Sequence, residues 1–450
     1  MTTMTKTTTT RPPAASRDIR VFVGPDKAIG GNPAPVWLDA DALSTEQMQE
    51  HTRLSGHESV FVLKPSTPAH RLRMRYFVPK HEMEMCGHAT VGALWLLHRR
   101  GEWDGTPIAI ETLSGTVTGR RVDGTVQISQ PRATVQAVTQ QPLVEEIAQC
   151  LGINVGQIAG PVLNAATSRV KTLVRLADTA QLHALRVDFA RVESLCERLG
   201  STGLYPYALS RDEADKPGTV SARQFPKSSG YPEDAATGIA AAALAWGLRH
   251  LGLVGDGALS VTVRQGEAMG SPSAIHVGLP SEAMAQEGCW VGGKACDAQP
   301  EDFLLDQLCP PEVSRARPSG TYATFARVGN LLHSSGVVAR ENGQVIAGRL
   351  DGPDDVARGQ RAAVAAVGAL LRAAQDELGS LSRVVRVVAL NGYLQASENF
   401  ADHAQVMDAA SAALQRIFPD AALPVRTTVG VASLPRGGVV EVSMVLETRG

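Results

Sequence analysis

Short runs in which apolar and polar residues alternate follow one another from Asp18 onward, separated by turns or by helical stretches. DIRVFVG, ESVFVLKP and HRLRMRYFVP have the two-residue period of β-strands, whereas HATVGALWLLHRRG has the composition and the basic, glycine-terminated end of a helix. A shorter helix is predicted after Ser44, because Ser44 as N-cap and Gln47 three residues later form a capping-box pattern. This mixture continues to about residue 298 and predicts an α+β fold.

The same part of the chain contains an internal repeat. A shift of 151 residues places segment 82–119 on segment 233–270 without a gap. The shift superimposes Glu82 on Glu233, Gly87 on Gly238, Trp95 on Trp246, Gly101 on Gly252 and Gly115 on Gly266. Residues 18–298 are therefore predicted to form two pseudo-equivalent lobes, each with strands around a central helix. The cleft between the lobes is the expected ligand site.

The remainder of the chain has a different order of elements. Residues 1–17 are Thr-rich and aperiodic and predict a disordered tail, whereas residues 299–318 are interpreted as a linker because of their Pro pair and mixed charge. Residues 319–450 then show two hairpin strands, a long amphipathic helix over 354–379, a strand, a second helix and two closing strands. This β-β-α-β-α-β order predicts a separate α+β domain.

Composition narrows the class of protein. The chain has 450 residues, 44% of them hydrophobic, and a formal net charge of −2 from 43 basic and 45 acidic residues, which is typical of two or three globular domains. The balanced charge argues against nucleic-acid binding, and no apolar run is long enough to span a membrane. Six scattered cysteines without a CxxC pair, and a first segment without an apolar signal core, favour free thiols in the cytoplasm.

Three segments carry candidate chemistry. Glu58 begins a strand, Cys86-Gly87-His88 precedes the first repeated helix, and EDAATG (233–238) precedes the second. A helix N-terminus favours an anion, so two such termini at one cleft predict a carboxylate substrate. Taken singly, Glu58 could be a strand-edge acid, and His88 and Asp234 could be helix caps. The spacing of Cys86, His81 and His88 matches no known metal site, and we expect neither a metal nor a cofactor.

Together these segments resemble a known family. GGNPAPVWL, ESVFVLKP, MRYFVPKHEMEMCGHATVGA, ARQFPKSSGYPEDAATG and VRQGEAMGSPS look, in this order, like the PhzF-like isomerases of phenazine biosynthesis. The resemblance covers residues 18–298 and implies the diaminopimelate-epimerase fold, whose two similar lobes agree with the repeat. It also implies that Glu58 shuttles a proton and that His88 and Asp234 complete the catalytic site. Substrate contacts are expected from Gly87, Thr237, Gly238, Gln265 and Gly266.

Two positions depart from this family. Ile239 stands where the phenazine isomerases have a serine, and Gly270-Ser271-Pro272-Ser273 lacks the arginine of their GRPS motif. Both departures leave room for a substrate other than dihydro-hydroxyanthranilate.

The repeat separates two chemistries of this fold. Racemases of the fold use one thiol from each lobe, and Cys86 occupies the first position. Its counterpart 151 residues later is Thr237, which cannot act as a thiol base. We therefore expect a single carboxylate, Glu58, to remove a proton and return it on one face, which shifts a double bond without inversion. A racemase or epimerase is the alternative within the fold.

Residues 319–450 resemble a second family, the Rid (YjgF-type) enamine/imine deaminases. The similarity rests on GNLLHSSG, VVRVVALNGYL and PVRTTVGVASLP followed by VVEVSM. It implies a chorismate-mutase-like domain that forms trimers. It also implies that Arg426 holds a substrate carboxylate at a subunit interface, with Tyr322 and Ser335 in the same site.

The Rid-like segment also departs from its family. The site asparagine of the family is Met407, its cysteine is Thr428 and its second glutamate is Ser443, whereas Glu441 is kept in the other register of its strand. An active deaminase and a binding or assembly domain that keeps only an arginine pocket are both compatible with this pattern.

These features predict an isomerase that moves a proton and a double bond in a small amino-carboxylate of secondary metabolism, joined to a module that binds or hydrolyses an enamine or imine. The alternative from another class is a non-catalytic ligand-binding or assembly scaffold. We expect a homo-oligomer, built as a dimer through the first domain and as a trimer or hexamer through the second. Partners among nucleic acids or membranes are not expected.

Overall fold

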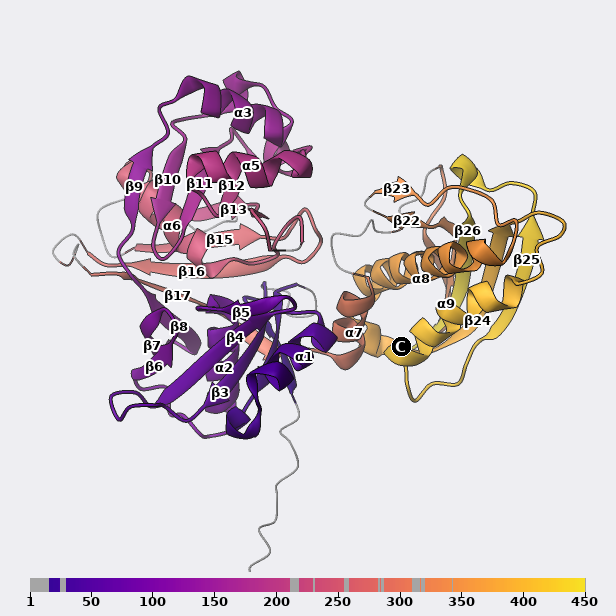
Figure 1. Ribbon diagram of the computed structural model, residues 1–450, viewed down its shortest axis with the longest axis horizontal. Helices are drawn as coiled ribbons and strands as arrows, with labels where there is room; N and C mark the ends of the chain where they lie inside the picture. The colour runs from indigo at the N-terminus through magenta and orange to yellow at the C-terminus, as the bar shows by residue number, and fades with distance from the viewer. Residues whose placement is uncertain are drawn as a thin grey trace, which may run out of the picture.

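The computed structural model describes residues 16–24, 30–210, 218–229, 231–254, 259–281, 284, 287–309, 316, 320–341 and 343–449. The tail expected over residues 1–17 lies outside the described residues except for its last two, and Arg17 already begins strand β1. Figure 1 shows two lobes, indigo to purple and magenta to rose, with an orange and yellow C-terminal domain beside them.

Each of the two lobes surrounds one central helix with strands. The first lobe contains α1 (Thr45–Ser55), α2 (Gly87–Arg99), β1 (Arg17–Val21), β2 (Asn32–Trp37), β3 (Ser59–Leu63), β4 (Leu72–Val78), β5 (His81–Met83), β6 (Ile108–Thr112), β7 (Gly115–Val122) and β8 (Thr125–Gln130). The second contains α3 (Gln141–Leu151), α4 (Thr179–His183), α5 (Phe189–Leu199), α6 (Gly238–His250), β9 (Thr134–Ala137), β10 (Leu163–Ala166), β11 (Val170–Arg175), β12 (Gly203–Leu209), β13 (Thr219–Ala222), β14 (Phe225–Pro226), β15 (Leu259–Gln265) and β16 (Ser273–Leu279).

The repeat seen in the sequence is a repeat of topology. In the first lobe β2 is antiparallel to β1 and parallel to β3, and in the second lobe β11 is antiparallel to β10 and parallel to β12. Helices α2 and α6 begin 151 residues apart and have the same length. The strands β17 (Cys289–Gly293) and β18 (Ala295–Asp297) join the lobes, because β17 pairs with both β16 and β8 and β18 pairs with β1.

The matched glutamates of the repeat have a structural role. Glu82 accepts two hydrogen bonds of 2.7 Å from the Arg75 guanidinium, and Glu233 accepts two of 2.8 and 2.7 Å from Arg223. Each pair closes the loop that leads into a central helix. A two-pronged pair of this kind fixes geometry as well as adding energy, so both helix N-termini are held in place.

The central helices are buried on nearly all sides because their residues are small and apolar. In α6 the run from Ala240 to Leu248 is buried, and Gly247 lets the strand beneath come so close that a Cβ there would lie 2.5 Å from Leu173 Cδ1. Helix α2 is covered in the same way by β1, β2 and β8. One continuous apolar cluster contains both helices and therefore ties the lobes together.

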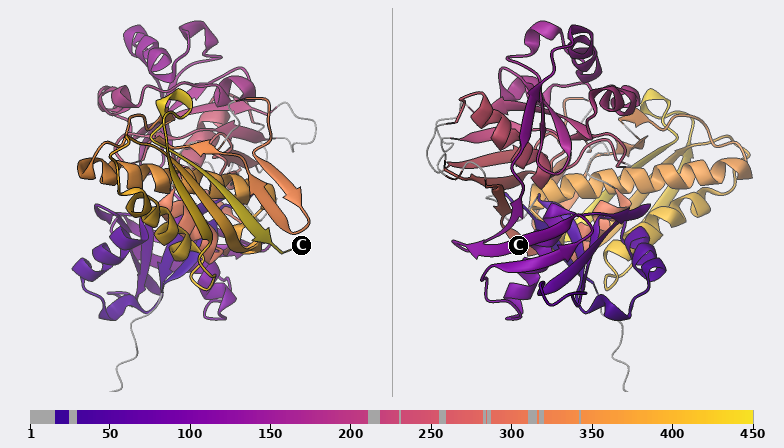
Figure 2. Two further views of the ribbon diagram at one scale, coloured as in Figure 1. Left: turned by 90° about the vertical axis from the view of Figure 1, so that its right-hand side faces the viewer. Right: turned by 60° about the vertical axis from the view of Figure 1, so that its left-hand side comes forward.

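The C-terminal domain places two helices on one face of a mixed sheet (Figure 2). The sheet has the order β19-β20-β26-β24-β25, with β24 and β25 parallel and the other neighbours antiparallel. In addition, β21 pairs with β26, and β22 and β23 form a separate two-stranded sheet. The elements of the domain are β19 (Phe325–Val328), β20 (Leu331–Ser334), β21 (Val337–Val338), β22 (Arg340–Glu341), β23 (Gln344–Val345), α8 (Val356–Leu378), β24 (Val384–Gln395), α9 (His403–Ile417), β25 (Val425–Val431) and β26 (Val440–Thr448). The α+β class is thus confirmed for both halves of the chain.

The prediction of a linker over residues 299–318 is wrong for the first half of this segment. Residues Pro300–Leu308 form helix α7, and Leu305 is buried in the core of the C-terminal domain. Asp302 is also buried and accepts hydrogen bonds from Gln375 Nε2, Ser380 Oγ and the Leu381 N–H. A buried carboxylate needs such partners, and they anchor α7 to the end of α8. The second half of the expected linker lies mostly outside the described residues.

Two further expectations concern cysteines and membranes. All six cysteines carry free thiols, five of them buried. Among the described residues, no helix combines the length and the apolar character that crossing a bilayer requires.

Candidate active site

A cavity of about 80 Å³ lies where the N-termini of α2 and α6 meet between the lobes. Seven of the residues expected at the site line it, namely Glu58, Cys86, Gly87, His88, Asp234, Thr237 and Gly238. Neither helix cap bonds to its own helix through a side chain, as the geometry at Cys86 and Thr237 shows. The first N–H groups of two buried helices therefore point toward one cavity, which favours an anionic ligand.

Glu58 lies just before β3 and is held from both lobes. The Cys86 thiol donates to its Oε2 at 3.1 Å, and His88 Nδ1 lies 3.6 Å from the same oxygen. From the second lobe, the Tyr231 hydroxyl donates to Oε1 at 2.9 Å. Burial raises the pKa of Tyr231 well above its ordinary value, so this hydroxyl stays protonated as a donor. Both carboxylate oxygens of Glu58 are therefore fixed toward the cavity.

Cys86 is a thiol rather than a thiolate. Burial, and secondarily the nearby Glu58 carboxylate, raise its pKa well above the ordinary value of 9.0. A thiol that donates to a carboxylate cannot also act as a base at neutral pH. The residue across the cavity in the second lobe is Thr237, as the repeat predicts, so the cavity offers no second thiol.

Asp234 is the second carboxylate of the cavity. It accepts hydrogen bonds from Asn32 Nδ2 at 3.0 Å, from the Ala236 N–H at 3.4 Å and from the Thr237 hydroxyl. Burial, together with the negative charge of Glu58, raises its pKa from 3.8 to about 6. Two carboxylates in different environments can divide the roles of proton acceptor and proton donor.

Gln265 and Gly266 do not line the cavity, although they were expected to contact substrate. The Gln265 amide accepts from the Tyr205 hydroxyl at 2.8 Å and donates to the Asp234 carbonyl at 2.7 Å. Gly266 has a φ of +77°, and a Cβ there would lie 2.1 Å from the Ser271 carbonyl oxygen. Both residues therefore support the loop that carries Asp234, on the side of the loop away from the cavity.

Several residues of the site were missed by sequence reasoning. Asn32 holds Asp234, Tyr231 holds Glu58, and Arg169 and Lys171 line the cavity. Asn32 and Tyr231 act on residues that are 202 and 173 positions away, so no local pattern marks them. Lys171 did leave a signal, because a charged residue stands within the mostly apolar strand segment VKTLV.

Three ligand-type atoms of the cavity are close enough to reach one metal ion. They belong to Glu58, Cys86 and His88 and lie within 4.8 Å of one another. In the structure the same atoms contact each other directly, as the 3.1 Å bond from Cys86 to Glu58 and the 3.4 Å contact between Cys86 and His88 show. An ion there would bind the carboxylate of Glu58, so metal binding would compete with proton transfer.

The expected residues of the C-terminal pocket do not meet within one chain. Arg426 lies on β25 and bonds Asp408 Oδ1 at 2.8 Å and Ser411 Oγ at 2.9 Å on α9. Ser335 follows β20 and Tyr322 precedes β19, on the other side of the sheet. Three strand spacings, roughly 14 Å, separate β25 from β20, and four, roughly 19 Å, separate it from β19, so only a second chain could bring the residues together.

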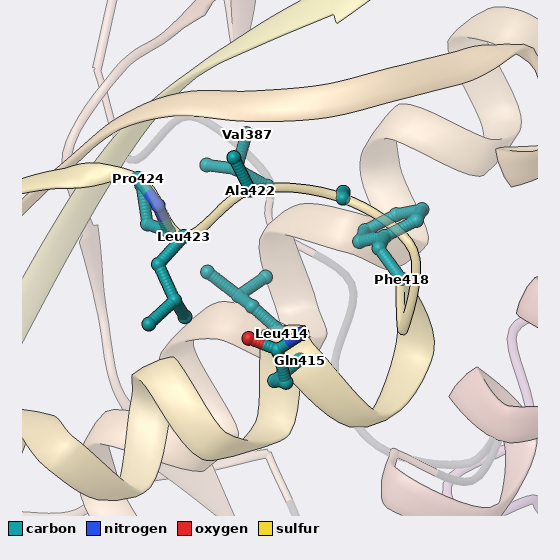
Figure 3. Close-up of a pocket in the computed structure, with 8 residues that line it drawn as sticks. Val387, Leu414, Gln415, Phe418, Ala422, Leu423 and Pro424 are labelled. Atoms are coloured by element: carbon teal, nitrogen blue, oxygen red, sulfur yellow. The ribbon is translucent and has the colours of Figure 1, made fainter.

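One departure from the Rid pattern, Met407, has a structural role in this chain. Met407 is fully buried on α9 and fills the space above Gly392, so it belongs to the core. Glu441 packs over Gly336, and burial raises its pKa above 4.5. The cavity in Figure 3, between the end of α9 and the segment that leads to β25, has about 10 Å³ and only apolar side chains plus Gln415. It holds at most one water molecule and no substrate.

The comparisons with known proteins follow the division of the chain. Residues 21–298 match the family described as phenazine biosynthesis-like protein, and residues 313–447 match the family described as endoribonuclease L-PSP. An uncharacterized isomerase of Deinococcus radiodurans is 34% identical over 280 residues, which cover 59% of this chain and 87% of the relative. A trans-2,3-dihydro-3-hydroxyanthranilate isomerase of Pseudomonas chlororaphis is 30% identical over 253 residues, which cover 55% of this chain and 84% of the relative.

A solved structure agrees with these matches. The Bacillus anthracis phenazine biosynthesis protein of the PhzF family has a TM-score of 0.57 at 24% identity and covers 64% of this chain and 97% of its own. At that identity the similarity establishes the fold. The chain therefore belongs to the phenazine biosynthesis-like (PhzF) family and carries a second domain of the endoribonuclease L-PSP, or Rid/YjgF, type.

Proposed function

We propose that the N-terminal domain is an isomerase in which Glu58 alone moves a proton between two positions of a small amino-carboxylate. The observation that carries the proposal is the position of Glu58, whose two oxygens are fixed from both lobes beside a protonated thiol. In the forward step a C–H bond breaks, the proton passes to Glu58, and the electron pair shifts the double bond. Glu58 then returns the proton to another carbon on the same face, so atoms and charge balance.

The other groups of the cavity support this step. The N–H groups at Gly87 and Gly238 and the two helix dipoles stabilise negative charge that develops when the proton leaves. Asp234, whose pKa burial raises to about 6, forms a hydrogen bond with the opposite side of the substrate and takes no part in the proton transfer. Ile239 lines the cavity where the phenazine isomerases have serine, which makes this wall apolar.

The relative from Pseudomonas chlororaphis supplies the first substrate to test, trans-2,3-dihydro-3-hydroxyanthranilate. Incubation of the full chain with this compound and with small cyclic imines in deuterated water should give an isomer whose mass is raised by one deuterium on carbon, because Glu58 exchanges its proton with the solvent before it returns one. Mass spectrometry and NMR measure both. Release of ammonia without an isomer would instead indicate deaminase chemistry in the C-terminal domain.

Replacement of Cys86 by alanine is expected to slow isomerisation by less than about tenfold. The thiol is a weak donor, and its single hydrogen bond to the Glu58 carboxylate contributes about 1 kcal/mol. Turnover and retention of configuration are the readouts. Deuterium incorporation with inversion that disappears in Cys86→Ala would support the racemase alternative and contradict the single-glutamate reaction.

Replacement of Asp234 by asparagine is expected to make the N-terminal domain more stable at pH 8. The pKa of Asp234 is raised from 3.8 to about 6 in the folded chain, so folding favours the protonated form. That contribution is complete below pH 3.8 and is lost as the pH rises through about 6, which leaves a buried charge above that pH. Asparagine carries no such charge.

Melting curves test this expectation. All five tryptophans precede residue 299, so their fluorescence reports on the N-terminal domain alone. The Asp234→Asn chain should melt several degrees higher than wild type at pH 8 and no higher near pH 4. Asp104→Asn serves as control. Thr106 lowers the pKa of that exposed carboxyl, so the substitution should not raise the melting temperature at any pH. A lower melting temperature for Asp234→Asn at pH 8 would contradict the cost of the charge.

For the C-terminal domain we propose a role in assembly and ligand binding rather than water activation. Met407 fills the core where the family has asparagine, and Arg426 is satisfied by Asp408 and Ser411 within its own chain. A scaffold without catalysis in either domain is the competing proposal. It predicts ligand binding without any isomer in the incubation described above.

A further inference from the structure

One charged side chain of the cavity has no role in the proton shuttle. Lys171 is the second residue of β11 and points to the same side of the strand as Leu173, which packs against α6. Core positions of this kind normally carry apolar residues. Lys171 is only 4% exposed, and its side chain ends in the cavity that Glu58 and Asp234 line.

Other buried cations of the chain are satisfied by protein groups. Arg223 forms two hydrogen bonds with Glu233, Arg372 bonds Gln375 and the Cys309 carbonyl, and Arg20 bonds the Gly30 carbonyl. For the Lys171 ammonium, the described part of the chain provides neither a hydrogen bond within 3.5 Å nor a carboxylate within 4.0 Å. Burial lowers the pKa of Lys171 from 10.5 to about 8, although Asp234 and Glu58 act in the opposite direction.

An unpaired buried ammonium is costly unless a ligand supplies the partner. The cavity is divided in charge, with Glu58 and Asp234 as its acidic groups and Lys171 and Arg169 as its basic ones. Arg169 also lines an outer groove of about 690 Å³. The positive charges of Arg169 and Lys171 therefore extend from this groove into the cavity. A ligand with a single negative charge fits this division, because a dianion such as phosphate would be repelled by the two carboxylates.

We propose that Lys171 receives the carboxylate of the substrate and thereby orients its amine and reacting carbons toward Glu58 and Asp234. This inference rests on the proposed isomerase function and adds to it the group that recognises the substrate. Lys171 is a binding residue, whereas Glu58 acts on the proton. The two roles can therefore be separated by experiment.

The test uses anthranilate and its neutral amide, 2-aminobenzamide, as probes with the full chain. The two compounds have nearly the same shape and differ in charge, and neither has the double bond arrangement that Glu58 could shift. Calorimetric titration should show that wild type binds anthranilate more tightly than the amide. Lys171→Met should lose roughly 10- to 100-fold in affinity for anthranilate and less than twofold for the amide, since a hydrogen bond between charged groups is lost.

Two matched variants control the result. Arg175→Met removes a cation from the far end of the same strand, outside the cavity, and should leave both affinities unchanged. Lys171→Arg keeps the charge and should retain part of the preference for anthranilate. If Lys171→Met does not fold by circular dichroism, Lys171→Gln, which also lacks the charge, is measured in its place.

Several outcomes would overturn the proposal. Equal losses for the acid and the amide would show that Lys171 only balances charge or supports the fold. Unchanged affinities in Lys171→Met, or a wild type that binds neither compound at millimolar concentration, would remove the carboxylate site. Glu58→Gln should still prefer anthranilate, so a failure of the proton shuttle appears in turnover and a failure of Lys171 appears in binding.

Discussion

Glu58→Gln should lower isomerisation by at least about 100-fold while the fold is retained. General acid–base catalysis contributes roughly 10²–10⁴-fold, and a glutamine side chain cannot accept the proton. Its carbonyl oxygen can still accept the bond from Tyr231, and its volume is nearly that of Glu58. The rate should therefore fall without a loss of the site's geometry.

Initial rates on the compound that wild type converts, together with tryptophan-monitored melting, measure both parts of this expectation. Glu102→Gln is the matched control, because Glu102 is an exposed carboxylate in the same lobe that lines neither the cavity nor the outer groove. It should keep more than half of the rate. Near-wild-type turnover in Glu58→Gln would sink the assignment of Glu58 as the base.

The full chain should form a trimer or a hexamer at micromolar concentration, so its mass in solution should be at least three times that of one chain. The helices of the C-terminal domain cover one face of its sheet, and Arg426 points toward α9 on that side. The alternate residues of β25 carry Val425 and Val429, which are 73% and 40% exposed. An apolar sheet face without cover is typical of a subunit interface.

Light scattering on the full chain and on a chain that ends at residue 298 measures this prediction. The shorter chain keeps both lobes, loses α7 with its own domain, and should be a dimer or a monomer. Val425→Lys combined with Val429→Lys should lower the mass of the full chain, whereas Leu54→Lys on the exposed side of α1 should not. A monomeric full chain would refute the trimer, and with it any pocket that Arg426 forms with Tyr322 and Ser335.

Sequence reasoning reached furthest where a signal is local or repeated. The Ser44–Gln47 capping box is present with both of its hydrogen bonds, because a cap depends only on residues within one turn. The 151-residue repeat located both central helices, since a buried helix needs small apolar residues and glycines at matched positions of both segments. The order of elements in the C-terminal domain was predictable for the same reason.

Other features were decided by packing between distant segments. The sequence does not predict helix α7, because nine residues carry too little periodicity to show which surface they cover. The family resemblance predicts Gln265 as a substrate contact, but its hydrogen bonds to Tyr205 and the Asp234 backbone hold its side chain outside the cavity. A side chain's partners depend on which strands become neighbours, and the local sequence around the side chain does not predict that pairing.

The sequence by itself determined the two lobes, the acid at Glu58 and the replacement of a second thiol by Thr237. Only the tertiary structure decided that Tyr231 from the other lobe fixes Glu58, that Cys86 stays protonated and that Lys171 lines the same cavity as both carboxylates. It also placed Arg426 three strands away from the end of β20, which Ser335 follows. The reason is physical: the periodicity of a chain encodes which of its faces are buried, whereas the chemistry of a site depends on which buried faces meet.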